Sequence, residues 1–541
     1  MTLHLAVPAP DQNANLTVET RPPQVSEWLE SLPLSNLSEA ARALSDALNA
    51  LNRSKINEET RLKLLELYRS TIHRLLPALE AQFSGLPLPL PEKARQIANQ
   101  TRQLQVELAN GYKLILLDYI NHRAGFGTDR LLPLVVERAL ASLSRILTVC
   151  YQTYAPTPAG VWSEIHQLFR YAAQEKIQDE PVADMGRQSS ISLAYKQILL
   201  LTLVDPYRLM QGEAGKVMEY LTHFGSHAQL QPLAQTSNPA ALFLVRLDSD
   251  KPPKALAHNA AITDARTDIL LNTIELARML HHQILRLETG DSPKSLFLPD
   301  DAKDPAYQGM LRRMLKHWGV APKRIFKRTL KEAGMGVHAD SRMEICSGIR
   351  TIYYFLNGKK PFVPPELAKK AEENEITLQF PTAALEAGSQ RTFTTSEWAI
   401  VNESAGGLAI RKASTAPTDT TVGEVIGLHA KQTGTWNIGV VRWVHSENPD
   451  HLEMGTQMLA PRASPAAIKP VIASAAAVFQ AALLLPEIPS LKQPASIVAP
   501  RGTFQPQREF HLLQDGSTQA IRATKLVEQT TSFDLFEFGL S

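Results

Sequence analysis

The sequence predicts a multidomain protein whose first half is α-helical and whose second half is built from β-strands. From Val25 to about Tyr220, apolar residues recur at helical spacing almost without interruption. After Lys331, short apolar runs alternate with turn residues and prolines, as in antiparallel strands. The chain has 541 residues, enough for about two to four domains that each have their own core.

The composition is that of an ordinary globular protein. Apolar residues make up 44% and charged residues 20% of the chain. The formal net charge of +2 argues against a protein that binds nucleic acid polymers. The two cysteines, Cys150 and Cys346, suit a reducing compartment and provide neither a disulfide framework nor a zinc site.

The longest apolar run, Val471–Leu485, is shorter than the roughly 20 residues that a membrane-spanning helix needs. We therefore expect a buried helix or a domain connector here, and no membrane span. The first residues lack the basic region of a secretory signal, and their apolar run is short and broken by Pro8. These features predict a cytoplasmic protein.

The first half divides into three segments. Residues 1–23 are polar with several prolines, so we expect them to be disordered. Residues 24–222 are expected to form an all-α module of about six or seven helices, with Pro, Gly, Asn or Asp at the helix ends. The helical pattern weakens over residues 223–320, which predicts a mixed, mainly helical connector. Within the connector, residues 242–247 have the character of a short strand or a buried run.

Strands and turns dominate the second half. We expect a first strand over Met343–Leu356 and a helical stretch, rich in Lys and Glu, over Pro365–Glu375. After Pro486, short apolar segments flank turns such as Gln514–Ser517. Residues 471–541 are therefore expected to form a small C-terminal β extension.

The most informative turn is Asn402–Gly407, with the sequence Asn-Glu-Ser-Ala-Gly-Gly between two apolar segments. A short amide, a hydroxyl and glycines in one turn allow a backbone to approach an anionic ligand closely. Upstream lie Arg324 and Arg328, which have the spacing RxxxR. Downstream, residues 436–443 have the sequence Trp-Asn-Ile-Gly-Val-Val-Arg-Trp.

In this order, the three segments resemble the signature of PilZ domains, which bind the bacterial second messenger cyclic di-GMP. The resemblance covers roughly residues 322–469 and implies a PilZ-like antiparallel β-barrel over residues 321–470. PilZ domains usually have fewer residues between the arginine pair and the Ser-Gly turn. The excess here fits an insertion of about residues 357–390 after the first strand, because surface insertions cost little free energy.

The resemblance implies that cyclic di-GMP is bound by Arg324, Arg328, Asn402, Ser404 and Gly407. Guanine presents O6 and N7 to an arginine fork, and guanidinium planes stack on purines. The amide and the hydroxyl would contact a base or a phosphate, while the glycine permits the close turn. Alternatively, the amide and the hydroxyl merely satisfy backbone groups in a β-turn, and the arginines belong to a solvated helix face.

Three further observations concern this region. Between Gln308 and Lys331 there are eight basic residues and no acid, which suits an anionic ligand. We expect Trp443 to belong to the core rather than to stack on the ligand, and Arg442 to pair with an acid on the barrel exterior. The identity of the first arginine stays open, because other arginines lie nearer to the turn. These are Arg342, Arg350 and Arg391.

Patterns that would indicate an enzyme are weak. His223 and His227 are four residues apart, but Gly225 suggests a helix end between them and no carboxylate is placed nearby. No P-loop, GxSxG elbow or Cys/His catalytic context occurs. We therefore predict no enzymatic activity, no catalytic residues, no metal and no cofactor besides the ligand.

The sequence as a whole predicts a cyclic di-GMP receptor that couples ligand binding by the barrel to the binding of a protein partner through the helical module. The alternative is a scaffold or adaptor whose PilZ-like barrel has lost the ligand.

Overall fold

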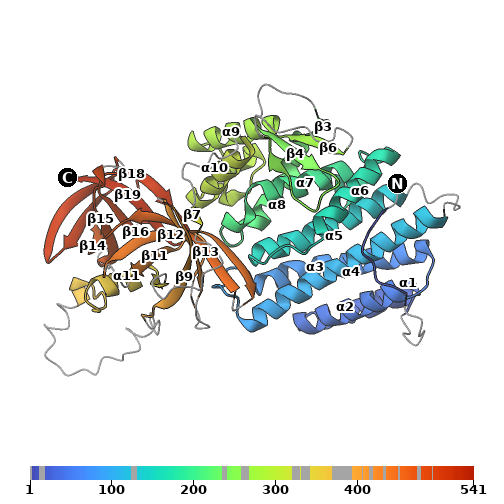
Figure 1. Cartoon of the computed structure of the whole chain (residues 1–541), viewed down its shortest axis with the longest axis horizontal. Coiled ribbons are helices and arrows are strands. Elements are labelled where there is room, and N and C mark those ends of the chain that lie inside the picture. Colours follow the sequence, from blue (N-terminus) through green and yellow to red (C-terminus); the bar gives the residue numbers. More distant parts are fainter. Residues whose placement is uncertain are drawn as a thin grey trace. The chain divides into compact units, whose positions relative to one another are not determined.

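The computed structural model divides the chain into two compact units, coloured in Figure 1 blue to yellow-green and, apart from residues 87–89, yellow to red. The first unit comprises Met1–Leu86 and Leu90–Lys323, and the second comprises Pro87–Pro89 and Arg324–Ser541. The structure describes residues 3–10, 19–122, 131–233, 240–256, 267–319, 329–330, 342–367, 393–404, 406–412, 418, 420–430, 434–448, 451–471, 477–489 and 492–540.

The first unit is mainly helical, as the periodicity predicts. Asn36, Asn57 and Ser190 precede helices and accept hydrogen bonds from backbone N–H groups of the first turns, so they act as N-caps. Across the described residues, no helix is both long and apolar enough to cross a membrane. The helices are α1 (Pro22–Glu30), α2 (Leu37–Arg53), α3 (Glu58–Ala81), α4 (Glu92–His122), α5 (Leu132–Gln152), α6 (Val161–Glu175), α7 (Ile191–Leu203), α8 (Glu213–Phe224), α9 (Ile274–Glu288) and α10 (Pro305–Gly319).

The first unit also contains two small sheets. A hairpin pairs β1 (Val182–Asp184) with β2 (Arg187–Ser189). The second sheet has the order β3-β6-β4-β5 and is antiparallel. The strand expected near residue 242 is confirmed as β4, but the sheet around it was not predicted. Its strands are β3 (Gln229–Pro232), β4 (Leu242–Arg246), β5 (Lys254–Ala255) and β6 (Asp268–Asn272).

The predicted disorder of residues 1–23 is wrong for residues 3–10. Leu3 and Leu5 are buried. The backbone N–H of His4 donates to Gln167 Oε1 at 2.7 Å, and the N–H of Ala6 donates to Glu164 Oε1 at 2.7 Å. This polar, proline-containing segment has no helix or strand, but side chains of α6 accept hydrogen bonds from two of its backbone N–H groups.

The second unit begins with a sheet of order β10-β13-β12-β11-β8-β9-β7, which closes because β9 also pairs with β10. This agrees with the predicted antiparallel barrel. Its strands are β7 (Thr329–Leu330), β8 (Arg342–Ser347), β9 (Ser396–Ser404), β10 (Gly407–Lys412), β11 (Val425–Ala430), β12 (Trp436–Asn448) and β13 (His451–Ala460).

The predicted first strand, Met343–Leu356, is half wrong. The strand β8 ends at Ser347, Gly348 has a φ of +86°, and the helix α11 (Ile349–Leu356) follows. The apolar run fits a strand by composition, but Ile349 and Ile352 are buried at helical spacing. Of the predicted helical stretch 365–375, residues 365–367 are helical and the remainder lies outside the described residues.

The chain ends in a second, closed barrel of order β14-β15-β16-β19-β18-β17, which is larger than the small β extension we predicted. Its first strand covers Ser464–Pro470, residues that we assigned to the preceding domain. The strands are β14 (Ser464–Pro470), β15 (Gln480–Leu485), β16 (Ser496–Pro500), β17 (Glu509–Gln514), β18 (Ser517–Gln529) and β19 (Phe533–Leu540).

The strand β15 explains the apolar run that we expected to be a buried helix or connector. Ala482 packs inside the second barrel, whereas Leu483 and Leu485 pack on the opposite side, against the first barrel and α11. A strand that is buried on both faces has a continuous apolar sequence instead of an alternating one. The helical interpretation of residues 480–485 is therefore wrong.

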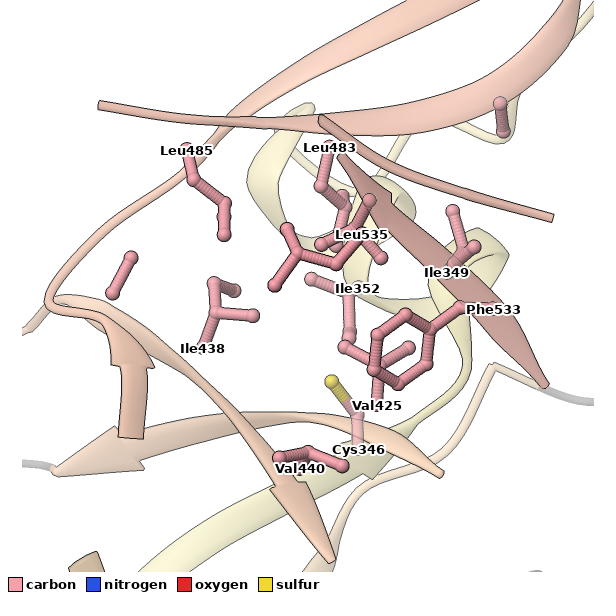
Figure 2. Packing of buried hydrophobic residues seen from close by; sticks show 13 residues of the cluster. Cys346, Ile349, Ile352, Val425, Ile438, Val440, Leu483, Leu485, Phe533 and Leu535 are labelled. Carbon is pink, nitrogen blue, oxygen red and sulfur yellow. The ribbon is translucent and has the colours of Figure 1, made fainter. Parts of the chain in front are cut away.

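One hydrophobic cluster joins the two barrels, and α11 contributes to its centre (Figure 2). Figure 2 shows Ile352 of α11 pointing toward Phe533 and Leu535 of the second barrel, with Val425 and Val440 of the first barrel beneath. We call this set the shared core. Its buried members are Cys346, Ile349, Ile352, Val425, Ile438, Val440, Ala460, Ala481, Leu483, Leu485, Val498, Phe533 and Leu535.

Candidate ligand-binding site

The Asn402–Gly407 segment connects β9 to β10 as a tight antiparallel hairpin. Ser404 pairs with Gly407 in the strand register, and the Ser404 hydroxyl donates a hydrogen bond to the Gly407 carbonyl at 3.1 Å. The hydroxyl therefore has the backbone partner that the alternative interpretation predicted. Its contact with a ligand stays a prediction.

Gly407 is required by a close approach between strands. A Cβ atom at this position would overlap the carbonyl oxygen of Thr456 and lie 3.1 Å from the Cα atom of Gln457. Both residues belong to β13, which pairs with β10 here. The glycine thus lets β13 pack directly beside the turn, in addition to permitting the close turn that the sequence predicted.

Substituting Gly407 with alanine is expected to lower the free energy of unfolding by about 1–3 kcal/mol, because β13 or the turn has to shift. Thermal unfolding would measure the loss. Gly539→Ala is a matched control, since a Cβ atom there would meet only Thr524 Cγ2 at 3.8 Å, an ordinary contact. Equal stability of the two variants would contradict the close-approach argument.

Asn402 lies on the outer face of the barrel, in a row that runs across four strands. It pairs with Ala409, Ala409 pairs with Gly455, and Gly455 pairs with Trp443. Directly opposed residues of antiparallel strands point to the same face. The face is marked by the neighbouring side chains of Arg411 and Gln457, which are exposed.

Trp443 therefore does not belong to the core, contrary to our expectation. A Cβ atom at position 455 would overlap the Trp443 indole, so the ring lies directly over the backbone of β13. The side chain is half-buried. A bulge between Val441 and Trp443 breaks the strict alternation that would have placed this ring on a predictable face.

The arginine pair, Arg324 and Arg328, lies outside the described residues. The structure does describe the two residues that follow, Thr329 and Leu330. They form β7, in which Thr329 pairs with Glu403 and Leu330 pairs with Asn402. The strand β7, which directly follows the arginine pair in the sequence, therefore lies beside the turn.

The other arginines near the turn in sequence are placed differently. Arg342 pairs in register with Ala399 and forms an ion pair with Glu397 at 3.1 Å, near the start of β9. Arg350 is exposed in the first turn of α11. Arg391 lies outside the described residues.

The positive region between Gln308 and Lys331 is partly neutralised. Arg312 forms an ion pair with Glu288 at 2.7 Å, and Arg313 forms one with Glu213. Acidic side chains from other helices therefore lie beside these two arginines, although no acid occurs in this stretch of the sequence. The remaining basic residues of the region are Lys316, Lys323, Arg324, Lys327, Arg328 and Lys331.

Arg442 has the acidic partner that we predicted, and the partner belongs to the second barrel. Its Nη2 donates to Glu528 Oε2 at 2.8 Å, and Nη1 donates to Glu528 Oε1. Its Nε donates to Gln457 Oε1 at 2.8 Å. Gln457 in turn pairs with Gly407 in the register of β10 and β13.

Cysteine and histidine side chains are not gathered into a site among the described residues. Cys150 and Cys346 are buried and free, and burial raises the pKa of Cys346 to about 12. Within the same residues, no three His, Cys, Asp or Glu side chains are arranged to hold a metal ion. His223 lies at the end of α8 with its ring 6.0 Å from that of Phe224.

Comparison with known protein families finds three consecutive matches along the chain. Residues 23–235 match the model of "Cyclic-di-GMP receptor FimW, N-terminal domain". Residues 242–380 and 365–465 match "Cyclic-di-GMP receptor FimW, middle PilZ domain". Residues 466–541 match "FimW C-terminal beta-barrel domain". The middle match includes the first barrel, and the last match corresponds to the second.

The chain is also similar over nearly its full length to a characterised protein. It is 27% identical, over 586 aligned residues, to the cyclic-di-GMP receptor FimW of Pseudomonas aeruginosa. The alignment covers 99% of this chain and 93% of that protein. No solved structure matches this chain.

Proposed function

Since this chain belongs to the PilZ domain family and carries a long N-terminal helical region, we propose that it is a receptor for cyclic di-GMP. In this proposal the first barrel binds the nucleotide, and the helical module passes the signal to a protein partner in the cytoplasm. The protein binds and releases its ligand without chemical conversion. The alternative remains a scaffold that has lost the ligand.

The observation that carries the proposal is the pairing of β7 with β9. Thr329 follows Arg328 directly in the sequence, and it lies opposite Glu403, between Asn402 and Ser404. The strand register thus brings Thr329, the residue that follows Arg328, beside the turn despite the long sequence separation. It supports the choice of Arg328 over Arg342, which pairs with Glu397 near the start of β9.

The chemistry of the proposed site matches a cyclic dinucleotide. Arg324 and Arg328 would supply guanidinium forks for guanine O6 and N7 or for phosphate oxygens. Asn402 and Ser404 would supply an amide and a hydroxyl from the hairpin. The Ser404 hydroxyl would have to turn from the Gly407 carbonyl toward a phosphate oxygen, which costs one ordinary hydrogen bond.

We add Trp443 to the proposed site. Its indole lies flat on the outer face, in the same cross-strand row as Asn402. A base that stacks on an aromatic side chain gains about 1–3 kcal/mol. A guanine bound beside Asn402 would therefore find a stacking surface that the sequence alone did not indicate.

The direct test is a calorimetric titration of the full chain with cyclic di-GMP. We expect a dissociation constant on the order of micromolar or tighter, which corresponds to about −8 kcal/mol or better. GTP should bind far more weakly, because it lacks the second guanine and the cyclic phosphodiester ring. Absence of heat at high ligand concentration would refute the receptor function and favour the scaffold.

Coupling to the helical module has its own test. Gly319 ends α10, and Pro322 follows before the arginine pair. If the ligand draws the arginines onto the turn, hydrogen exchange should slow over residues 319–330 and 402–410, with smaller changes in the helices. Protection of the turn alone would leave the binding site intact but contradict the coupling through this junction.

A further inference from the structure

The guanidinium group of Arg442 makes three hydrogen bonds although it projects from the outer face of the first barrel. Its fork meets the Glu528 carboxylate through two hydrogen bonds, and its Nε donates to Gln457 Oε1. The two charged side chains are 29% and 21% exposed, so this ion pair is less screened than a surface pair. Glu528 lies on β18 of the second barrel.

The same guanidinium group lies close to the proposed ligand turn. Gly407 of β10 pairs with Gln457 of β13, and β13 pairs with β12, which carries Arg442. Neighbouring strands are about 4.8 Å apart, so the Arg442 backbone is two strands, or roughly 10 Å, from the turn. Arg442 precedes Trp443, whose ring covers Gly455 on the same outer face.

We propose that Arg442 is a further ligand-binding arginine, which Glu528 occupies while the site is empty. The inference rests on the proposed function. A carboxylate and a phosphodiester are both anions that accept two parallel hydrogen bonds from one arginine fork. Because Nε already donates to Gln457 Oε1, the edge formed by Nη1 and Nη2 is the one that an anion can take in a bidentate way, so the nucleotide's phosphodiester and Glu528 compete for it.

This competition has a consequence for the two barrels. When the ligand takes Arg442, the ionic link between β12 and β18 opens. The shared core and the hydrogen bond from Ser532 Oγ to Glu424 Oε2, at 2.8 Å, still hold the barrels together. Ligand binding thereby reaches the second barrel as a local change at β18.

The test uses two substitutions that should change affinity in opposite directions. Glu528→Gln keeps the shape but removes the competing charge, and we expect it to tighten cyclic di-GMP binding roughly five- to tenfold. Arg442→Lys keeps the charge but loses the fork, and we expect it to weaken binding at least about tenfold. If the ion pair had a purely structural role, the two substitutions would not change the affinity for cyclic di-GMP in opposite directions.

Glu509→Gln is the matched control. It removes the acid from the Arg522–Glu509 pair, 2.7 Å long and within the second barrel, and should leave the affinity unchanged. All variants are titrated by calorimetry as full chains, with thermal unfolding to report their stability. In the wild-type chain, hydrogen exchange of residues 526–529 should become faster when cyclic di-GMP is added.

The outcomes separate this inference from the receptor function. If the wild-type chain binds no cyclic di-GMP, both are overturned. If it binds but Glu528→Gln binds equally or more weakly, only the role of Arg442 is overturned. If Glu528→Gln does not fold, hydrogen exchange of residues 526–529 in the wild-type chain tests the competition instead. Exchange that is unchanged or slower after cyclic di-GMP is added refutes it.

Discussion

Replacing Phe533 with alanine is expected to destabilise both barrels together, by about 3–5 kcal/mol. Phe533 is fully buried and lies at the centre of the shared core, beside Ile352 of α11 (Figure 2). Its removal leaves a cavity lined by residues of both barrels, and neither barrel can fill that cavity alone. Chemical denaturation followed by tryptophan fluorescence would measure the loss, since Trp398, Trp436 and Trp443 report on the first barrel.

Leu540→Ala is the control for the Phe533 variant. Leu540 ends the same strand but is 79% exposed, so its removal should change the free energy of unfolding little. The shared core predicts one cooperative transition for both barrels. If Phe533→Ala opens only β14–β19 in hydrogen exchange, while β11 and β12 keep their protection, the barrels are independent and the prediction is wrong.

Arg328→Ala is expected to weaken cyclic di-GMP binding by roughly 2 kcal/mol or more, at least about thirtyfold. The substitution would remove a charge-assisted, bidentate contact made by the residue that precedes β7 in the sequence. Thermal stability should stay close to that of the wild-type chain, which separates ligand contact from folding damage. Calorimetric titration of the full chain measures the effect.

His223→Ala is the control for Arg328→Ala. His223 is at the end of α8, in the first unit, and no role in binding follows from its position. We expect an unchanged affinity. If both substitutions weaken binding equally, the loss reflects general damage to the protein, and the assignment of Arg328 to the ligand is refuted.

The sequence predicted the features that depend on local patterns. The helices of the first unit follow from their apolar spacing and caps, and the hairpin around Ser404 follows from its turn residues. The continuous apolar run at residues 480–485 misled the prediction, because a strand buried between two packed layers resembles a buried helix. The opposite error occurred at Ile349–Leu356. This helix was predicted to be a strand because its aromatic and β-branched residues favour strands.

Features that depend on distant parts of the chain escaped the prediction. The sequence predicted that Arg442 pairs with an acid but not which one. The partner, Glu528, lies 86 residues away in the sequence and is identified only by the fold. The position of Trp443 depends on a bulge that the residue pattern does not predict. Gly407 was predicted to permit a close turn at the ligand site, but its close approach to Thr456 becomes apparent only when β13 is paired with β10.

The position of β7 relative to the turn does not depend on the length of the insertion that precedes β9. This strand has nine residues, so its start at Ser396 and its end at Ser404 are about 27 Å apart at 3.3–3.4 Å per residue. The insertion joins the strand at Ser396, whereas β7 meets it at Asn402 and Glu403. Searches for related receptors that require a fixed spacing between arginine pair and turn would therefore overlook chains such as this one.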